Sequence, residues 1–124
     1  APLSRAFELQ KRARQRGFDW DSAGPAADKV RAELNEVMAS TGGTPVGEEV
    51  RSDVEEEIGD LLFSAVNLSR KLGVDPSLAL HRANRKFKRR FEAVEAEMEE
   101  RGIEMSAEQL DTMDAIWSKA KSSE

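Results

Sequence analysis

Two pairs of acidic residues have a spacing that could support chemistry. Glu33 and Glu36 are three positions apart, and so are Glu57 and Asp60. Residues three or four apart lie on the same face of a helix, so each pair places two carboxylates side by side. Both pairs border an apolar stripe, where a charge is costly unless a partner offsets it. A single pair of this kind is ordinarily a rim of solvated acids on an amphipathic helix.

Taken together, the two pairs predict a metal site. If their helices pack against each other, Glu33, Glu36, Glu57 and Asp60 converge. Four carboxylates cannot approach closely unless they are protonated or bridged by cations. Oxygen ligands favour hard ions, so the expected ion is Mg²⁺ or Mn²⁺ and not zinc. Because bound Mg²⁺ recruits phosphate oxygens, the substrate is expected to be phosphorylated. A coincidental cluster of surface acids is the alternative.

Three basic residues are candidates for binding phosphate. Lys29 precedes Glu33 by four positions and therefore shares its helix face. Within the later basic run 82–90, Lys86 and Arg90 fall together on one flank of the helix if Phe87 marks the core direction. Arg89 then points nearly away from the core. We expect Lys29, Lys86 and Arg90 to offset phosphate charge. For the basic run as a whole, a solvated face is the alternative.

The elements that must position these residues are amphipathic helices, separated by Gly and Pro signals. The predicted helices span residues 3–16, 25–40, 48–72, 76–101 and 107–121. Asp75 is the expected N-cap of the fourth helix, with Pro76 at its first position. The sequence contains no internal repeat, and we expect one domain over residues 1–124.

The third predicted helix, 48–72, is the centre of this arrangement. Its apolar residues recur at helical spacing, and we expect them to face the core. They are Val54, Ile58, Leu61, Leu62 and Ala65. Phe18 and Trp20, in the short segment between the first two helices, are expected to be packing anchors.

Composition limits the classes of function. The 124 residues are 39% hydrophobic and 35% charged, and the net charge of −5 argues against general affinity for nucleic acid. There is no Cys, so disulfides and thiolate metal sites are excluded, and a reducing cytoplasm is the expected location. No apolar run approaches the roughly 20 residues needed to span a bilayer, so we expect no membrane association. The first residues lack the apolar core of a secretory signal.

Other catalytic chemistries have little support in the sequence. His81 is the only histidine, and the sequence shows no Cys and no evident Ser partner for it. The sequence therefore does not support a nucleophilic triad. No Gly-x-x-x-x-Gly-Lys motif is present, so the sequence contains no P-loop signature.

Several segments resemble the MazG family of nucleoside triphosphate pyrophosphohydrolases. The family signature is Glu-Glu-x-x-Glu, a variable gap, and Glu-x-x-Asp, and segments 29–36 (KVRAELNE) and 55–63 (EEEIGDLLF) are similar to it. Further similarity covers nearly the whole chain, at residues 17–20, 66–68, 83–91 and 112–117. The resemblance is closest to the catalytic C-terminal domain of two-domain bacterial MazG proteins. One departure is Ala32, which stands where the family has the first Glu of its signature.

The resemblance implies an all-α helical bundle that is completed by homodimerisation. It implies Mg²⁺-dependent hydrolysis of nucleoside triphosphates to the monophosphate and pyrophosphate, with house-cleaning of nucleotide pools as the suggested role. By motif position the metal ligands would be Glu33, Glu36, Glu57 and Asp60. Asp60 would also bind the substrate. Glu36, rather than Glu33, is the expected general base.

The resemblance also assigns the substrate contacts. Lys29, Lys86 and Arg90 would contact the triphosphate, and Trp117 would contact the base or its surroundings. Two other functions stay open. One is a base-selective enzyme of the all-α dUTPase or dCTPase kind. The other is a catalytically silent helical module that dimerises or binds nucleotides, for which Ala32 is the sequence feature in favour.

Overall fold

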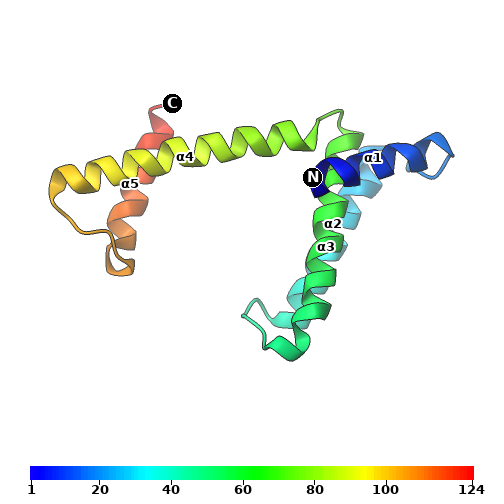
Figure 1. Ribbon diagram of the computed structural model, residues 1–124, viewed down its shortest axis with the longest axis horizontal. Coiled ribbons are helices and arrows are strands. Elements are labelled where there is room, and N and C mark those ends of the chain that lie inside the picture. Colours follow the sequence, from blue (N-terminus) through cyan, green and yellow to red (C-terminus); the bar gives the residue numbers. More distant parts are fainter. The chain divides into compact units, whose positions relative to one another are not determined.

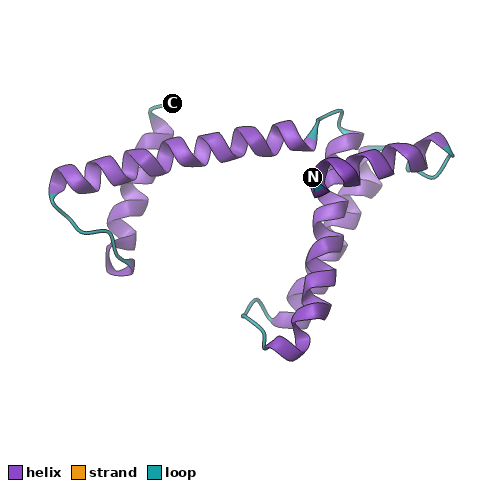
Figure 2. Ribbon diagram, viewed as in Figure 1, coloured by secondary structure: helices purple, strands orange, loops and turns teal.

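The computed structural model describes residues 1–124 except for the side chain of Glu49, and its described residues form helices and no strand (Figures 1 and 2). This confirms the predicted all-α class. The elements are α1 (Pro2–Gln15), α2 (Ala23–Thr41), α3 (Glu48–Lys71), α4 (Pro76–Arg101), a 3-10 turn (Ala107–Gln109) and α5 (Leu110–Ser122). Within this part of the chain, no helix has both the length and the apolar character needed to cross a membrane.

Local signals set the helix ends close to the predicted positions. α2 ends at Gly42, which adopts the left-handed conformation at φ 62° and donates its N–H to the carbonyl of Met38 at 2.8 Å. A glycine suits this position because it has no Cβ to oppose a positive φ. At the start of α4, the Asp75 carboxylate accepts a hydrogen bond from the backbone N–H of Ser77 at 2.9 Å. The predicted N-cap of α4 is therefore confirmed.

The chain divides into two compact units, Ala1–Ala79 and Leu80–Glu124. In the first unit α2 and α3 lie side by side and α1 packs against α3 (Figure 1). Its buried apolar residues are Ala26, Val37 and Val66. Gln10 of α1 is also buried and donates its side-chain N–H to the backbone carbonyl of Phe63 at 2.9 Å. A polar contact thus joins α1 to α3.

The face that α3 turns toward its neighbours differs from the predicted one. Ser64 and Asn67 are buried, whereas Ile58 and Leu62 of the apolar stripe remain 38% and 59% exposed. The buried polar groups find partners on their own helix, since Ser64 Oγ donates to the Leu61 carbonyl at 2.8 Å. The expectation that the apolar stripe faces the core of the same chain is wrong at these two positions and at Ala65, which is also exposed. α1 and α2 pack against α3 but leave them exposed.

The second unit contains α5 and most of α4. Its core consists of Val94, Met98 and Ile116, and Met98 is fully buried. Phe87, the residue taken as the core direction, contacts Trp117 with ring centroids 5.2 Å apart but stays largely exposed. The core of this unit therefore begins about two helical turns after Phe87.

Candidate functional site

An ion pair on α2 forms the centre of the candidate site. Lys29 Nζ lies 2.8 Å from Glu33 Oε1, one helical turn along the same face. Glu33 is buried, and its second oxygen, Oε2, has no hydrogen-bond partner among the described residues. A buried carboxylate oxygen without a partner is costly unless a ligand or an ion satisfies it.

The other α2 carboxylate interacts with the same group. A hydrogen bond to Glu33, together with the negative charge of Glu33, raises the pKa of Glu36, and the charge of Glu57 raises it further. The pKa of Glu33 is lowered, chiefly by its hydrogen bond from Lys29. The pKa of Lys29 is raised, mainly by Glu33, and the charges of Glu36 and Asp60 add to this effect. Glu33 and Glu57 therefore act electrostatically on Glu36, and Asp60 acts on Lys29.

Glu57 and Asp60 approach this centre from α3. Ser40 Oγ, near the end of α2, lies 2.9 and 3.1 Å from the two carboxylate oxygens of Glu57 and donates to them. Among the described residues, no three acidic or histidine side chains stand close enough together to hold a metal ion. The chemistry of the donors nevertheless fits Mg²⁺, because all are oxygens and Glu33 Oε2 lacks a partner. Ligation by Glu33, Glu36, Glu57 and Asp60 stays a prediction.

A cavity of about 540 Å³ opens beside this centre in the first unit. Three residues of the candidate site, Lys29, Glu33 and Asp60, contribute to its lining. Its remaining lining combines aromatic, polar and charged side chains and includes Phe18, Trp20, Phe63, Gln10, Ser64, Asn67, Asp19 and Arg70. Ligand sites commonly have apolar walls and a few fixed polar groups, so this cavity can hold a ring system next to a charged group.

Phe18 and Trp20 are the cavity residues that the sequence interpretation missed. They are 85% and 42% exposed, so they are not the packing anchors that we expected. Both come from the segment between α1 and α2 and line the cavity. The sequence did contain a signal for their role. Two large aromatic residues flank an acid in a short segment that belongs to no amphipathic helix.

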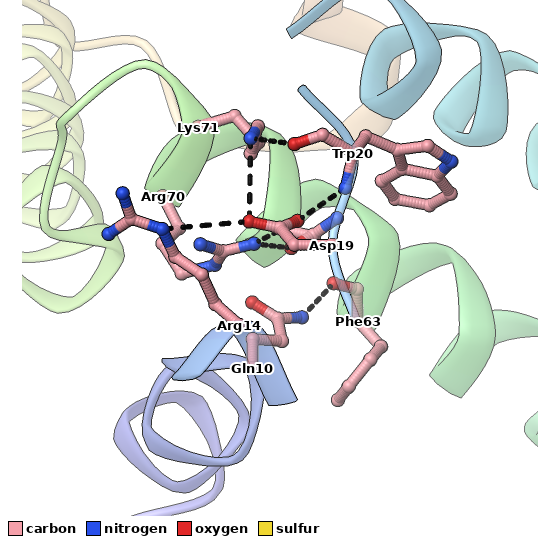
Figure 3. Close-up of polar contacts among 8 residues, drawn as sticks. Gln10, Arg14, Asp19, Trp20, Phe63, Arg70 and Lys71 are labelled. Carbon is pink, nitrogen blue, oxygen red and sulfur yellow. Dashed lines mark hydrogen bonds and ion pairs between the residues drawn. The ribbon is translucent and has the colours of Figure 1, made fainter. Parts of the chain in front are cut away.

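Asp19, between these two aromatics, lies at the centre of a charged cluster (Figure 3). Arg70 Nη2 donates to its Oδ1 at 2.7 Å, and Lys71 Nζ lies 3.4 Å from its Oδ2. Arg14 Nε is 3.9 Å from Oδ2. The hydrogen bond from Arg70 is the main reason that the pKa of Asp19 is lowered.

The remaining predicted residues, Lys86, Arg90 and Trp117, belong to the second unit. The Arg90 side chain is 13% exposed and lies 5.9 Å from the centre of the Trp117 ring. It also pairs with Glu124, with Nη2 2.7 Å from Oε2. Lys86 is exposed. Contact of these three residues with a substrate stays a prediction.

Replacing Glu36 by glutamine is expected to raise the melting temperature at pH 7 when no divalent cation is added. The pKa of Glu36 is raised in the folded state, so the ionised carboxylate is less favourable there than in the unfolded chain. Above that pKa the negative charge therefore opposes folding, and glutamine removes it. At about pH 3 the carboxyl is protonated in both the folded and unfolded states, so the gain disappears. Thermal unfolding at the two pH values measures this difference.

Glu55→Gln, at an exposed position on α3, is the matched control for Glu36→Gln. It removes one negative charge without touching the α2 pair. An equal gain at both pH values, or an equal gain for the control, would contradict the proximity of Glu36 to the other acids.

Comparison with known proteins gives relatives but no matching protein-family model. The chain is 45% identical over 122 residues to the nucleoside triphosphate pyrophosphohydrolase of Escherichia coli strain K12, covering 98% of this chain and 45% of that protein. It is 40% identical over 119 residues to the nucleoside triphosphate pyrophosphohydrolase/pyrophosphatase MazG of Thermotoga maritima, covering 96% of this chain and 44% of that protein. A shorter match, 39% over 72 residues, relates it to the uncharacterized protein YabN of Bacillus subtilis, covering 58% of this chain and 15% of that protein.

The chain thus spans slightly less than half the length of the first two relatives. The matches confirm the resemblance inferred from the acidic signatures. Across nearly its whole length, the chain is a homologue of one part of proteins named nucleoside triphosphate pyrophosphohydrolases, MazG among them.

Proposed function

We propose that this chain hydrolyses nucleoside triphosphates, both ribo- and deoxyribonucleotides, to the monophosphate and pyrophosphate in an Mg²⁺-dependent reaction. The observation that carries the proposal is the buried Glu33 carboxylate, which has one unpartnered oxygen and lines a cavity together with aromatic side chains. The names of the E. coli and T. maritima relatives support the same reaction.

The proposed ligands of Mg²⁺, or of Mn²⁺ in its place, are Glu33, Glu36, Glu57 and Asp60. When bound, such an ion neutralises phosphate charge and lowers the pKa of a water molecule. Glu36 is the proposed general base, because a carboxylate at the proposed ion could take a proton from a water molecule bound there.

The basic residues have a separate role in this proposal. Lys29 balances the charge of Glu33 and faces the α2 acids, so it can also bind a phosphate oxygen. Lys86 and Arg90 stabilise the charge that develops on the departing pyrophosphate. Trp117 lies beside Arg90 and would contact the base or its surroundings.

The aromatic part of the cavity supports a nucleotide rather than a bare polyphosphate as substrate. Phe18, Trp20 and Phe63 line the cavity that also contains Lys29 and Asp60. Bases stack on aromatic side chains whatever their hydrogen-bonding pattern, so such a wall suits several bases. A broad house-cleaning role in the cytoplasm agrees with this tolerance.

Exposed apolar side chains support the proposed homodimer. Both units leave large apolar residues open, among them Ile58, Leu62, Phe63, Leu80 and Phe87. Apolar surface of this kind commonly marks a contact with another chain, and a second copy is the simplest partner for an amphipathic helix pair. Analytical sedimentation at several protein concentrations measures whether the chain associates with itself.

Pyrophosphate release from a panel of ribo- and deoxynucleotides, with Mg²⁺ and with a chelator, tests the proposed reaction. We expect release from several nucleotides in Mg²⁺, none in chelator, and strong loss in Glu57→Ala. Turnover of one base alone would favour the enzyme of the dUTPase or dCTPase kind. No turnover of any nucleotide would favour the silent module.

A further inference from the structure

The segment between α1 and α2 brings two aromatic residues to the cavity and places an acid between them. Phe18, Asp19 and Trp20 all line the cavity, and the Asp19 carboxylate is held in the charged cluster at the end of α3. The Trp20 indole points away from that cluster (Figure 3). The Phe18 ring is 85% exposed, so its own packing cannot fix its position.

The charged cluster holds the backbone on both sides of Trp20. The Asp19 Oδ1 atom accepts the Trp20 N–H at 2.9 Å, and Lys71 Nζ donates to the Trp20 carbonyl oxygen. Arg70 is held in turn by Asn67, whose Oδ1 accepts from Arg70 Nη2 at 2.8 Å. The side chains of Asp19, Arg70 and Lys71 are all about nine-tenths buried. The indole is therefore attached to a backbone that the ion pairs fix.

Stability alone is a weak explanation for this cluster. Desolvation of charged groups offsets much of the gain from a buried ion pair, and apolar residues of similar volume often stabilise a protein as well or better. Ion pairs and hydrogen bonds do specify geometry, because each contact requires a defined direction. Three cations converge on the one residue that lies between the two aromatics.

We propose that Asp19 is a positioning residue that, through Arg70 and Lys71, holds Phe18 and Trp20 in place to stack on the nucleobase of the substrate. This inference rests on the proposed function and deepens it, since it names residues of the segment between α1 and α2 that would stack on the base. The Asp19 carboxylate is already paired with three cations, so the proposed role of Asp19 is to act through the two aromatic neighbours. Its contribution is to substrate binding, equally in the ground state and the transition state, so it affects KM and not kcat.

A double-mutant cycle between Asp19 and Trp20 tests the proposal. Asp19→Asn is expected to raise KM for ATP by about tenfold with kcat nearly unchanged, since base stacking on an aromatic side chain is worth roughly tenfold to a hundredfold in affinity. In a Trp20→Ala background the same substitution is expected to change KM by less than about twofold, because the ring it positions is gone. Asp21→Asn, at an exposed position in the same segment, is the matched control and leaves KM unchanged.

A structural role alone would give a different result. In that case Asp19→Asn would lower the melting temperature and the amount of active enzyme, so apparent kcat would fall with KM unchanged. The effect of Asp19→Asn would also be the same with Trp20 present and in the Trp20→Ala background. Either pattern would overturn the proposal. If Asp19→Asn fails to fold, Lys71→Met removes the contacts to Asp19 and to the Trp20 carbonyl, and it must raise KM in the same Trp20-dependent way.

Binding of AMP, followed by calorimetry, separates this proposal from the proposed reaction. Turnover of ATP by the unsubstituted chain without any effect of Asp19→Asn on KM or on the AMP dissociation constant would overturn the positioning role alone. AMP binding that weakens in Asp19→Asn, in a chain that shows no turnover, would support the positioning role and reject the reaction. Absence of both turnover and AMP binding would reject both.

Discussion

Replacing Asp60 by asparagine is expected to lower kcat/KM for nucleoside triphosphates by about a thousandfold, with the helical fold intact. Asp60 lines the cavity with Lys29 and Glu33, and its negative charge contributes to the raised pKa of Lys29. Asparagine keeps the shape of the side chain but removes a charged oxygen that the proposed ion would require. Loss of one group that stabilises developing charge costs a factor of this order. Pyrophosphate release measures the activity, and circular dichroism measures the fold.

Asp53→Asn is the matched control for Asp60→Asn. Asp53 is exposed on α3, two helical turns before Asp60, and does not line the cavity. Its substitution is expected to leave kcat/KM unchanged. Because Asp60 is itself exposed, its substitution exposes no core and is expected to change stability little, so unchanged circular dichroism would assign a loss of activity to the site. Full activity in Asp60→Asn would remove this residue from the proposed site.

Arg90 and Arg89 are expected to differ sharply when each is replaced by methionine. Arg90→Met should lower kcat/KM by about a hundredfold, and Arg89→Met by less than about threefold. The Arg90 side chain is 13% exposed and lies against Trp117, whereas that of Arg89 is 61% exposed. A cation with little access to water interacts more strongly with phosphate than one surrounded by solvent. Steady-state kinetics with ATP measures both effects.

Glu124 supplies the control for the arginine comparison, because it pairs with both side chains. The ion pairs lower the pKa of Glu124 to about 2, mainly through the hydrogen bond from Arg90, so it is ionised throughout the usual assay range. Glu124→Gln weakens these ion pairs but keeps both cations, and its kcat/KM must not fall. Equal losses for the two arginine substitutions would refute the distinction between them.

Helix periodicity and end signals are local properties, and they were sufficient to predict most of the secondary structure. Asp75 was identified as a cap from its own neighbours in sequence, and the structure confirms it. The spacing of Glu33 and Glu36 likewise predicted that these acids share a face, and their effect on each other's pKa agrees with this. Each of these inferences needs only residues within about one helical turn.

The choice of which α3 face is buried could not be made in this way. Periodicity identifies the apolar side of a helix, but it does not say whether the same chain or another one covers that side. Here α1 and α2 pack on the side containing Ser64 and Asn67, and Leu62 remains exposed. The cavity was missed for a similar reason, because Phe18 and Trp20 reach it from a segment without periodic structure.

The hydrogen bond between Gln10 and Phe63 fixes the chemical identity of one side chain. A backbone carbonyl can only accept, so the Gln10 atom that faces Phe63 must be the amide nitrogen, and the two ends of the amide cannot be interchanged. A glutamate at this position would set two oxygens against each other in a buried place. The α1–α3 contact is therefore stable with glutamine at position 10, and deamidation of Gln10 to glutamate would remove the hydrogen bond and destabilise the contact.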